Sequence, residues 1–256
     1  MAAHIGHGKE GPNKLPFRSY LYAAPANRAA VAGGFASEAD ALVLDLEDLT
    51  PAAQKAEARL AATAHLAEAV ARGRATLVRI NAAESDDVIA ADLDAVIREG
   101  LVAVRLPKSE DPARIRDIAR RIEDLRVARG LVATIGLQVM VETARGIEAL
   151  PQLVRATHTI WSLGLGEGDL KATTGVTSDT GLHFARSAVT FAARAAGLPA
   201  AVQVAYPPEG SEEGLVASTR LGRDLGFGAR SLLNPQHVAA VHAIYTAQGD
   251  ERGAAA

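Results

Sequence analysis

The chain of 256 residues contains no cysteine, and this absence excludes several kinds of chemistry. Without cysteine there is no disulfide framework, no cysteine-ligated zinc, no iron–sulfur cluster and no thiol nucleophile. Aromatic residues make up only 4% of the chain, so the core has to be built from alanine, valine, leucine and isoleucine. This composition favours closely packed layers of helices and strands.

Two further absences narrow the class of protein. No window holds the roughly 18 uninterrupted apolar residues that a membrane span needs, and the polar first sixteen residues lack the apolar core of a signal peptide. The formal net charge is −3, whereas nucleic-acid binders usually carry a clustered basic excess. We therefore expect a cytoplasmic, enzyme-sized domain that binds neither a membrane nor nucleic acid.

Eight short apolar runs alternate with segments of helical pattern. The runs are continuous rather than alternating, which is typical of strands covered on both faces in a parallel sheet. They lie at 19–23, 41–46, 75–80, 101–106, 134–141, 159–163, 200–205 and 230–233. The helical segments lie at 27–37, 51–72, 86–99, 110–129, 144–156, 182–196, 212–226 and 235–247.

One strand followed by one helix, eight times over, predicts a closed (β/α)8 barrel, the TIM barrel. We expect a single barrel domain over 17–247, with flexible tails at 1–16 and 248–256. An open doubly wound sheet is the competing fold. The glycine-rich run 164–169 lacks the spacing of a dinucleotide-binding fingerprint and carries two carboxylates where a pyrophosphate would sit, which disfavours that alternative.

Charged and polar residues gather where the predicted strands end. Active sites of such barrels lie at the carboxyl ends of the strands. A buried isolated charge at such a position is costly unless it is paired or holds a metal. The residues concerned are Asp45, Glu47, Asp48, Arg79, Asn81, Lys108, Glu142, Glu167, Asp169 and Asn234.

Carboxylates from several strands, with no cysteine and no suitably paired histidine, predict a site with oxygen ligands only. Oxygen ligands select hard cations, and Mg²⁺ held by one or two carboxylates plus substrate and water is the common arrangement. An arginine beside such a metal suits a carboxylate or ketoacid, because the guanidinium matches two oxygens. A serine triad is disfavoured because no G-x-S-x-G sequence is present.

Structural roles for the same residues stay open at this point. Glu142 and Asp169 are also suited to the first turns of helices, where acids stabilise the helix dipole. The acidic segment 45–48 is also compatible with a solvated turn. Arg79 and Lys108 are also compatible with a network of structural ion pairs.

The order of these motifs resembles the citrate lyase β-subunit-like proteins of the HpcH/HpaI aldolase/citrate lyase superfamily, over residues 17–245. The opening Arg18-Ser19-Tyr20-Leu21-Tyr22, followed by Pro25, resembles R-S-x-L-(F/Y)-x-P. Segment 39–48 resembles A-D-x-(V/I)-x-L-D-L-E-D. Further matches in order are Lys55 with Ala58-Arg59, Val78-Arg79-Ile80-Asn81, Leu106-Pro107-Lys108, Glu142-Thr143-Ala144-Arg145-Gly146 and Gly166-Glu167-Gly168-Asp169-Leu170.

The resemblance implies a barrel that binds Mg²⁺ and cleaves or forms carbon–carbon bonds in acyl-CoA thioesters of the citryl-, malyl- or citramalyl-CoA type. The metal ligands it implies are Glu142 and Asp169. Arg79 would grip the ketoacid, and Glu47 would support the site. Arg18, Lys108 and Gly166 would contact the substrate. The resemblance also implies a homo-oligomer, commonly a trimer or a hexamer.

Two positions depart from the family pattern. Asn234 stands where the motif near the eighth strand has histidine, and Ser211 stands where family lyases often carry aspartate in D-x-E-G-L. Three hypotheses therefore stay open: a CoA-dependent lyase, a class II pyruvate or hydroxy-dicarboxylate aldolase without CoA, and a metal- and ketoacid-binding homologue with weak lyase activity. The opening at Arg18 and the pair Lys55 and Arg59 favour CoA, and the serine predicts weak cleavage of citryl-CoA.

Overall fold

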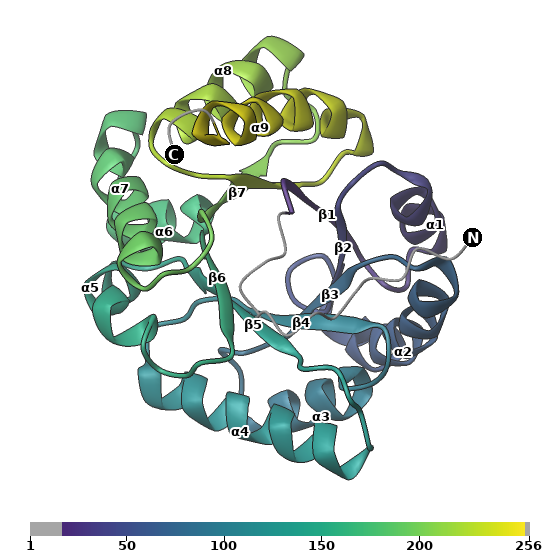
Figure 1. The fold of residues 1–256 in the computed structure, drawn as a ribbon. Helices are drawn as coiled ribbons and strands as arrows, with labels where there is room; N and C mark the ends of the chain where they lie inside the picture. Colours follow the sequence, from purple (N-terminus) through teal and green to yellow (C-terminus); the bar gives the residue numbers. More distant parts are fainter. Residues whose placement is uncertain (1–16, 254–256) are drawn as a thin grey trace.

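The computed structural model describes residues 17–253, and it confirms the predicted (β/α)8 barrel. Eight parallel strands close in chain order, so that β1 pairs with both β2 and β8 (Figure 1). The strands are β1 Ser19–Ala23, β2 Ala41–Asp45, β3 Thr76–Arg79, β4 Leu101–Leu106, β5 Gly136–Val141, β6 Ile160–Leu165, β7 Val202–Tyr206 and β8 Ala229–Leu232.

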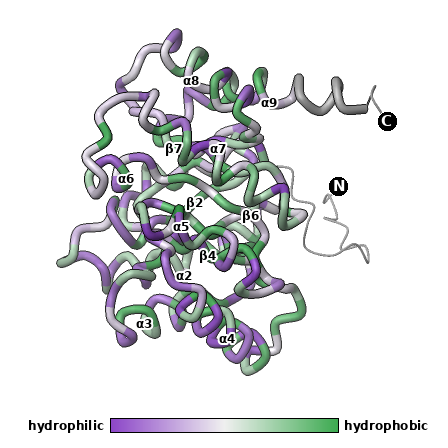
Figure 2. The backbone as a smooth tube through the Cα atoms, turned by 90° about the vertical axis from the view of Figure 1, so that its left-hand side faces the viewer, coloured by the Kyte–Doolittle hydropathy of each residue, from purple (hydrophilic) through white to green (hydrophobic). Residues whose placement is uncertain are grey.

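The helices surround the barrel and cover the outer faces of its strands (Figure 1). They are α1 Arg28–Ala36, α2 Lys55–Arg72, α3 Asp86–Val96, α4 Pro112–Ala128, α5 Ala144–Leu153, α6 Glu167–Thr174, α7 Asp179–Ala195, α8 Glu212–Asp224 and α9 Val238–Gly253. Short 3-10 turns lie at Ala52–Gln54 and Pro235–His237. In Figure 2 hydrophobic and hydrophilic stretches alternate along these helices, as expected of helices with one apolar face. No helix within 17–253 is long and apolar enough to cross a bilayer.

Three predicted boundaries need correction. Between β6 and β7 the chain forms two helices, α6 and α7, because Gly175 adopts a left-handed φ of 73° and ends the first one. α2 begins at Lys55 instead of residue 51, because Ala52–Gln54 form a 3-10 turn before it. The predicted tail at 248–256 is helical as far as Gly253, since no proline interrupts α9 there. The predicted tail at 1–16 lies outside the described residues.

The interior of the barrel changes in character from one end to the other. Apolar side chains fill its amino end, where Tyr20, Val43 and Leu77 pack together with small residues such as Ala41 and Ala103. Side chains along a strand alternate between its two faces, so Asp45 shares the inward face with Val43, two residues earlier. The larger apolar core lies outside the strands, beneath the helices. The charged side chains at the ends of β2 and β3 therefore lie at the carboxyl end, where barrels carry their sites, while Gln138 and Ser162 lie midway along β5 and β6.

Side-chain contacts between the start of β1 and α9 accompany the pairing of β1 with β8 that closes the barrel. The hydroxyl of Ser19 at the start of β1 lies 2.8 Å from Nε2 of His242 in α9. Arg18 donates to Thr246 at 2.8 Å and to the carboxylate of Asp40. These contacts join β1, the approach to β2 and the last helix into one seam.

Candidate functional site

A fully buried carboxylate at the end of β2 organises the mouth of the barrel. Asp45 is 0% exposed and accepts hydrogen bonds from the backbone amides of Glu47 and Leu49, both at 2.9 Å. Its two oxygens also accept from Nε and Nη2 of Arg79, at 2.7 and 2.6 Å. Asp45 therefore shapes the acidic turn that follows β2 and fixes the guanidinium of the neighbouring strand at the same time.

The guanidinium group of Arg79 forms ion pairs with three carboxylates. Its Nη1 lies 2.8 Å from Glu47 Oε2 and 3.1 Å from Asp48 Oδ2, in addition to the paired bonds from Asp45. Burial opposes the charge, but hydrogen bonding to Asp45 and the nearby charges raise the pKa of Arg79 above its ordinary value. Arg79 is a permanent cation whose charge is already balanced by the acids around it.

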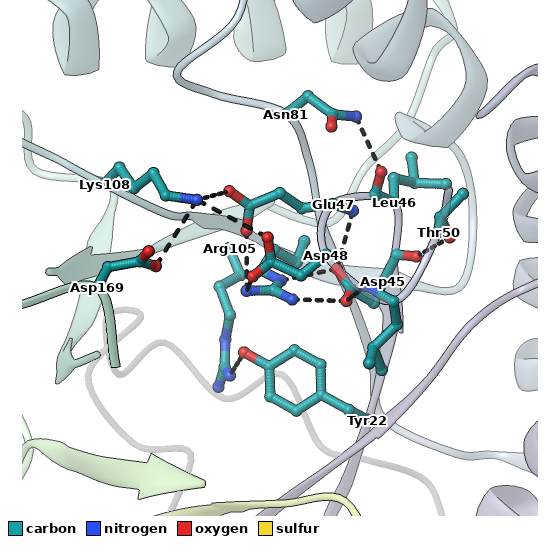
Figure 3. A network of polar contacts seen from close by, with 12 residues as sticks. Tyr22, Asp45, Leu46, Glu47, Asp48, Thr50, Asn81, Arg105, Lys108 and Asp169 are labelled. Atoms are coloured by element: carbon teal, nitrogen blue, oxygen red, sulfur yellow. Dashed lines mark hydrogen bonds and ion pairs between the residues drawn. The ribbon is translucent and has the colours of Figure 1, made fainter. Parts of the chain in front are cut away.

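Lys108 connects the turn after β2 to α6 (Figure 3). Its Nζ donates to Glu47 Oε1 at 2.6 Å and lies 3.7 Å from Asp169 Oδ2. Its φ of 47° is left-handed, a conformation that strains a non-glycine residue by about 1 to 3 kcal/mol and that concentrates at functional sites. Lys108 also lines a groove of about 540 Å³, whose walls include Pro107 and Ile115.

Glu142 is a buried carboxyl group with an unpaired oxygen. It follows β5, is 4% exposed, and its Oε2 has no hydrogen-bond partner. Burial, followed by the charge of Glu47, raises the pKa of Glu142 to about 8. A Cβ at Gly166 would lie only 2.6 Å from its Cγ, so glycine is what lets the loop after β6 approach this carboxyl group.

The two acids of the first turn of α6 have different roles. Asp169 keeps 44% of its side chain exposed, and its charge is among those that raise the pKa of Glu142. The segment that carries Asp169 approaches Glu142 closely at Gly166. Glu167 is buried and binds Arg186 of α7 through two bonds of 2.7 Å. Arg186 also donates to Asp179 at 3.0 Å. Glu167 therefore anchors α6 to α7, and Asp169 is the acid that remains available.

The donor set fits a hard divalent cation. The mouth gathers the carboxylates of Asp45, Glu47, Asp48, Glu142 and Asp169 against the two cations Arg79 and Lys108. No group of three or more histidine or acidic residues in the described part of the chain forms a complete metal site. The unpaired oxygen of Glu142 and the exposed carboxylate of Asp169 are of the kind that Mg²⁺ takes when it binds two protein carboxylates and completes its shell with water and substrate.

A row of polar side chains crosses five neighbouring strands in one register. In the register of neighbouring strands, Asp45 lies opposite Arg79, and Arg79 lies opposite Arg105. Arg105 lies opposite Gln138, which in turn lies opposite Ser162. Arg105 donates to the hydroxyl group of Tyr22 in this part of the barrel. Neither residue is among the site residues predicted from the sequence. The available signal was an arginine at an inward position of an apolar strand, V-A-V-R-L.

Arg18 lies at the other end of the barrel, and the prediction that it contacts substrate is wrong. It directly precedes β1, and its Nε and Nη2 donate to Asp40, which precedes β2, at 2.9 and 2.8 Å. Because all strands are parallel, these positions lie at their amino ends, opposite the mouth. Lys55 and Arg59 are likewise committed to internal partners, the first to Asn81 and the second to Asp92.

We expect Arg18→Ala to leave ligand binding at the mouth unchanged. The half-buried pair with Asp40 is lost, which should lower the free energy of unfolding by about 1 kcal/mol. Urea unfolding measures the stability, and calorimetry with Mg²⁺ and a ketoacid measures the binding. A tenfold or greater loss of ketoacid affinity would contradict this placement.

Both residues that depart from the family pattern form local hydrogen bonds. Ser211 caps α8, since its side chain accepts from the amide of Gly214 at 3.1 Å. Asn234 accepts from the amide of Gln236 at 2.9 Å and donates to the carbonyl of Pro208 at 3.2 Å. Each therefore has a structural role in its loop.

Comparisons with known proteins agree with this geometry. Residues 18–235 match the model of the HpcH/HpaI aldolase/citrate lyase family. Citrate lyase subunit beta of Escherichia coli (strain K12) is 33% identical over 232 residues, which cover 89% of this chain and 76% of that protein. The (3S)-malyl-CoA thioesterase of Cereibacter sphaeroides (strain KD131) is 29% identical over 238 residues, 90% of this chain and 78% of that protein.

A solved structure has the same fold. The citrate lyase beta subunit from M. tuberculosis, complexed with oxaloacetate and magnesium, superposes with a TM-score of 0.73 at 28% identity. The match covers 90% of this chain and 96% of that one.

Proposed function

The chain belongs to the HpcH/HpaI aldolase/citrate lyase family, and from that premise we propose that it is a Mg²⁺-dependent carbon–carbon lyase. Its substrate in this proposal is a 3-hydroxyacyl-CoA thioester of the citryl-, malyl- or citramalyl-CoA type, and its products are a ketoacid and an acyl-CoA. The observation that carries the proposal is the buried Glu142, whose Oε2 has no hydrogen-bond partner and against which Gly166 packs, at the start of the segment that carries the exposed Asp169. The M. tuberculosis relative, solved with magnesium and oxaloacetate, supports the metal and the ketoacid.

The reaction breaks the bond between the hydroxyl-bearing carbon and the α-carbon of the thioester. The hydroxyl group loses its proton and becomes the carbonyl of the ketoacid. The electron pair of the broken bond passes to the thioester enolate, which takes up a proton at carbon. When bound, Mg²⁺ supplies Lewis-acid polarisation of the substrate oxygens.

The residues of the chain have separate tasks in this scheme. Glu142 and Asp169 hold the cation. Arg79 and Lys108 place positive charge beside the substrate carboxylate. Arg79 acts through its charge, because Nε and Nη2 are held by Asp45 and Nη1 lies against Glu47 and Asp48. Glu47 bridges Arg79 and Lys108, at 2.8 and 2.6 Å, and so keeps both cations at the mouth. The backbone at Gly166 lies against Glu142, close to where the substrate would bind.

Calorimetry of ketoacid binding with and without Mg²⁺ tests the metal and ligand assignment. We expect binding of oxaloacetate or pyruvate to require Mg²⁺, and to be lost in Glu142→Ala and in Asp169→Ala. Asp117→Ala, which removes an acid on the outer face of α4, is the matched control and should bind normally. Unchanged binding in both site variants would contradict the assignment of Glu142 and Asp169 as metal ligands.

A second candidate activity is hydrolysis of the thioester, favoured by the (3S)-malyl-CoA thioesterase among the relatives. Mass spectrometry of the products separates the possibilities. From malyl-CoA, cleavage gives acetyl-CoA and glyoxylate, whereas hydrolysis gives malate and free CoA.

Turnover of a free hydroxy-dicarboxylic ketoacid, with no thioester turned over, would instead identify a class II aldolase. Ketoacid binding with little turnover would identify the weak-lyase homologue.

The setting in which we propose this activity is the cytoplasm, with the chain assembled as a homo-oligomer, a trimer or a hexamer. Light scattering on the purified protein measures the number of chains. A monomer at micromolar concentration would contradict the assembly.

A further inference from the structure

A second arginine lies in the same register row as Arg79 but in a different electrostatic setting. Arg105 is 0% exposed, and its donors go to neutral groups: Gln138 Oε1, the hydroxyl of Tyr22 and Ser231 Oγ. Its Nη2 has no hydrogen-bond partner. No acidic side chain in the described part of the chain forms an ion pair with it.

This lack of an acid partner sets Arg105 apart from the other guanidinium groups around the mouth. Arg79 is balanced by three carboxylates, and the buried Arg186 is balanced by Glu167 and Asp179. Burying an unpaired charge is costly, and removing the partner of a buried charge typically costs about 3 to 5 kcal/mol. A buried cation without an acid is therefore a position where an anionic ligand restores the balance.

Tyr22 contacts both Arg79 at the mouth and the buried Arg105. The tyrosine is half-buried, and two guanidinium groups lie close to its ring, with Arg79 Cζ at 5.1 Å and Arg105 Cζ at 4.9 Å from the ring centroid. Figure 3 shows its hydroxyl group directed at Arg105, beneath the acidic cluster. Because Arg105 donates to the hydroxyl oxygen, the hydroxyl hydrogen is left to donate elsewhere.

The charge distribution indicates which ligand this pair suits. Glu142 and Asp169 repel a carboxylate unless a cation lies between them and it. Arg79 is already balanced, and Lys108 is engaged by Glu47. Within the barrel, the positive charge of the described residues that lacks an acid partner lies at Arg105, one strand away from Arg79.

We propose that Tyr22 and Arg105 form an anion subsite that recognises the second carboxylate of a dicarboxylic ketoacid. The hydroxyl group of Tyr22 contacts that carboxylate, and Arg105 is a positioning residue that orients the hydroxyl and supplies the compensating charge. This inference rests on the proposed function, because it names the class of acid that the metal site would hold. It assigns to this chain a preference for acids of the oxaloacetate type over monocarboxylic acids of the pyruvate type.

Calorimetry with Mg²⁺ and either oxaloacetate or pyruvate tests the subsite. We expect the unaltered protein to bind oxaloacetate about 10- to 100-fold more tightly than pyruvate, the range for one hydrogen bond to a charged group. Arg105→Met keeps the length of the side chain and removes its charge, so it should abolish the preference while leaving pyruvate and Mg²⁺ affinities within about twofold. Tyr22→Phe removes only the hydroxyl group and should reduce the preference about 3- to 10-fold.

Two matched controls exclude a general effect of buried groups. Arg230→Met removes another buried arginine, which lies between β8 and α8 and donates to Ser218 and Thr219. Tyr245→Phe removes a hydroxyl group from a buried tyrosine of α9, which donates to Gln203 Oε1 at 2.9 Å outside the barrel interior. Neither control should change the ratio of the two affinities.

Each outcome decides the question. A preference retained in Arg105→Met, or lost equally in Arg230→Met, overturns the subsite. If Arg105→Met does not fold, Tyr22→Phe decides, because it leaves every charge in place, and an unchanged ratio in that variant overturns the proposal. Equal binding of both acids by the unaltered protein overturns the subsite alone. Binding of neither acid in the presence of Mg²⁺ overturns the proposed function and the subsite with it.

Discussion

Glu142→Gln should abolish Mg²⁺ binding and, in metal-free protein, remove a loss of stability at alkaline pH. The pKa of Glu142 is raised from 4.5 to about 8, first by burial and then by the charge of Glu47. The folded protein therefore keeps the proton to a higher pH than the unfolded chain does. Stability contributed by this group is present below the ordinary pKa and falls between about pH 4.5 and pH 8. The loss is of the order of 4 to 5 kcal/mol.

Urea unfolding in the presence of a chelator, from pH 5.5 to pH 9, measures this effect. Glutamine cannot ionise, so the variant should lack the part of the pH dependence that arises from Glu142. Added Mg²⁺ should restabilise the unaltered protein by mass action but leave the variant unchanged, since its Mg²⁺ affinity should fall by more than about 100-fold. Glu148→Gln, on the exposed side of α5, is the control. A variant that keeps the original pH profile, or the original Mg²⁺ affinity, would contradict the assignment.

Asp45→Asn should destabilise the protein severely, although it alters a single atom of the side chain. The carboxylate is 0% exposed and accepts four hydrogen bonds, two from backbone amides and two from Arg79. An amide NH₂ group at either oxygen position would face a donor instead of accepting from it. Breaking a buried ion pair by removing one partner typically costs about 3 to 5 kcal/mol. Urea unfolding measures the loss.

Asp48→Asn is the matched comparison, because Asp48 pairs with the same guanidinium at 3.1 Å but is 56% exposed. That change should cost less than about 1 kcal/mol, as exposed ion pairs usually do. Similar losses in the two variants would show that Asp45 does not organise the turn, and that the mouth is held by other contacts.

The barrel and most of its mouth are predictable from the sequence for one physical reason. A parallel strand covered on both faces has to be apolar along its length, so charges that follow it mark its carboxyl end. Asp45, Arg79, Lys108, Glu142 and Asp169 follow apolar runs in this way, and the structure brings them together. The pairing of Glu167 with Arg186 was not predictable, because it depends on how α6 packs against α7.

The predictions from sequence that were wrong or missing also have specific physical causes. The family motif contains Arg18, but a residue before a parallel strand lies at the amino end of the barrel whatever motif it belongs to. Arg105 is hidden within an apolar run, and only the alternation of faces along β4 indicates that it points inward. α6 is not predicted from the sequence, because it is short and begins with Glu167 and Gly168. It therefore lacks the apolar periodicity of a helix.

The seam between the first strand and the last helix has a consequence for how the chain acquires its structure. Ser19 and His242 are separated by 223 residues, and Arg18 and Thr246 by 228. Contacts of such long range form late, because the closure of a long loop is entropically unfavourable until other contacts are in place. During synthesis, β1 has no β8 beside it until residues 229–232 have left the ribosome. A growing chain therefore exposes an unpaired strand edge for most of its synthesis, and such edges favour association with other chains.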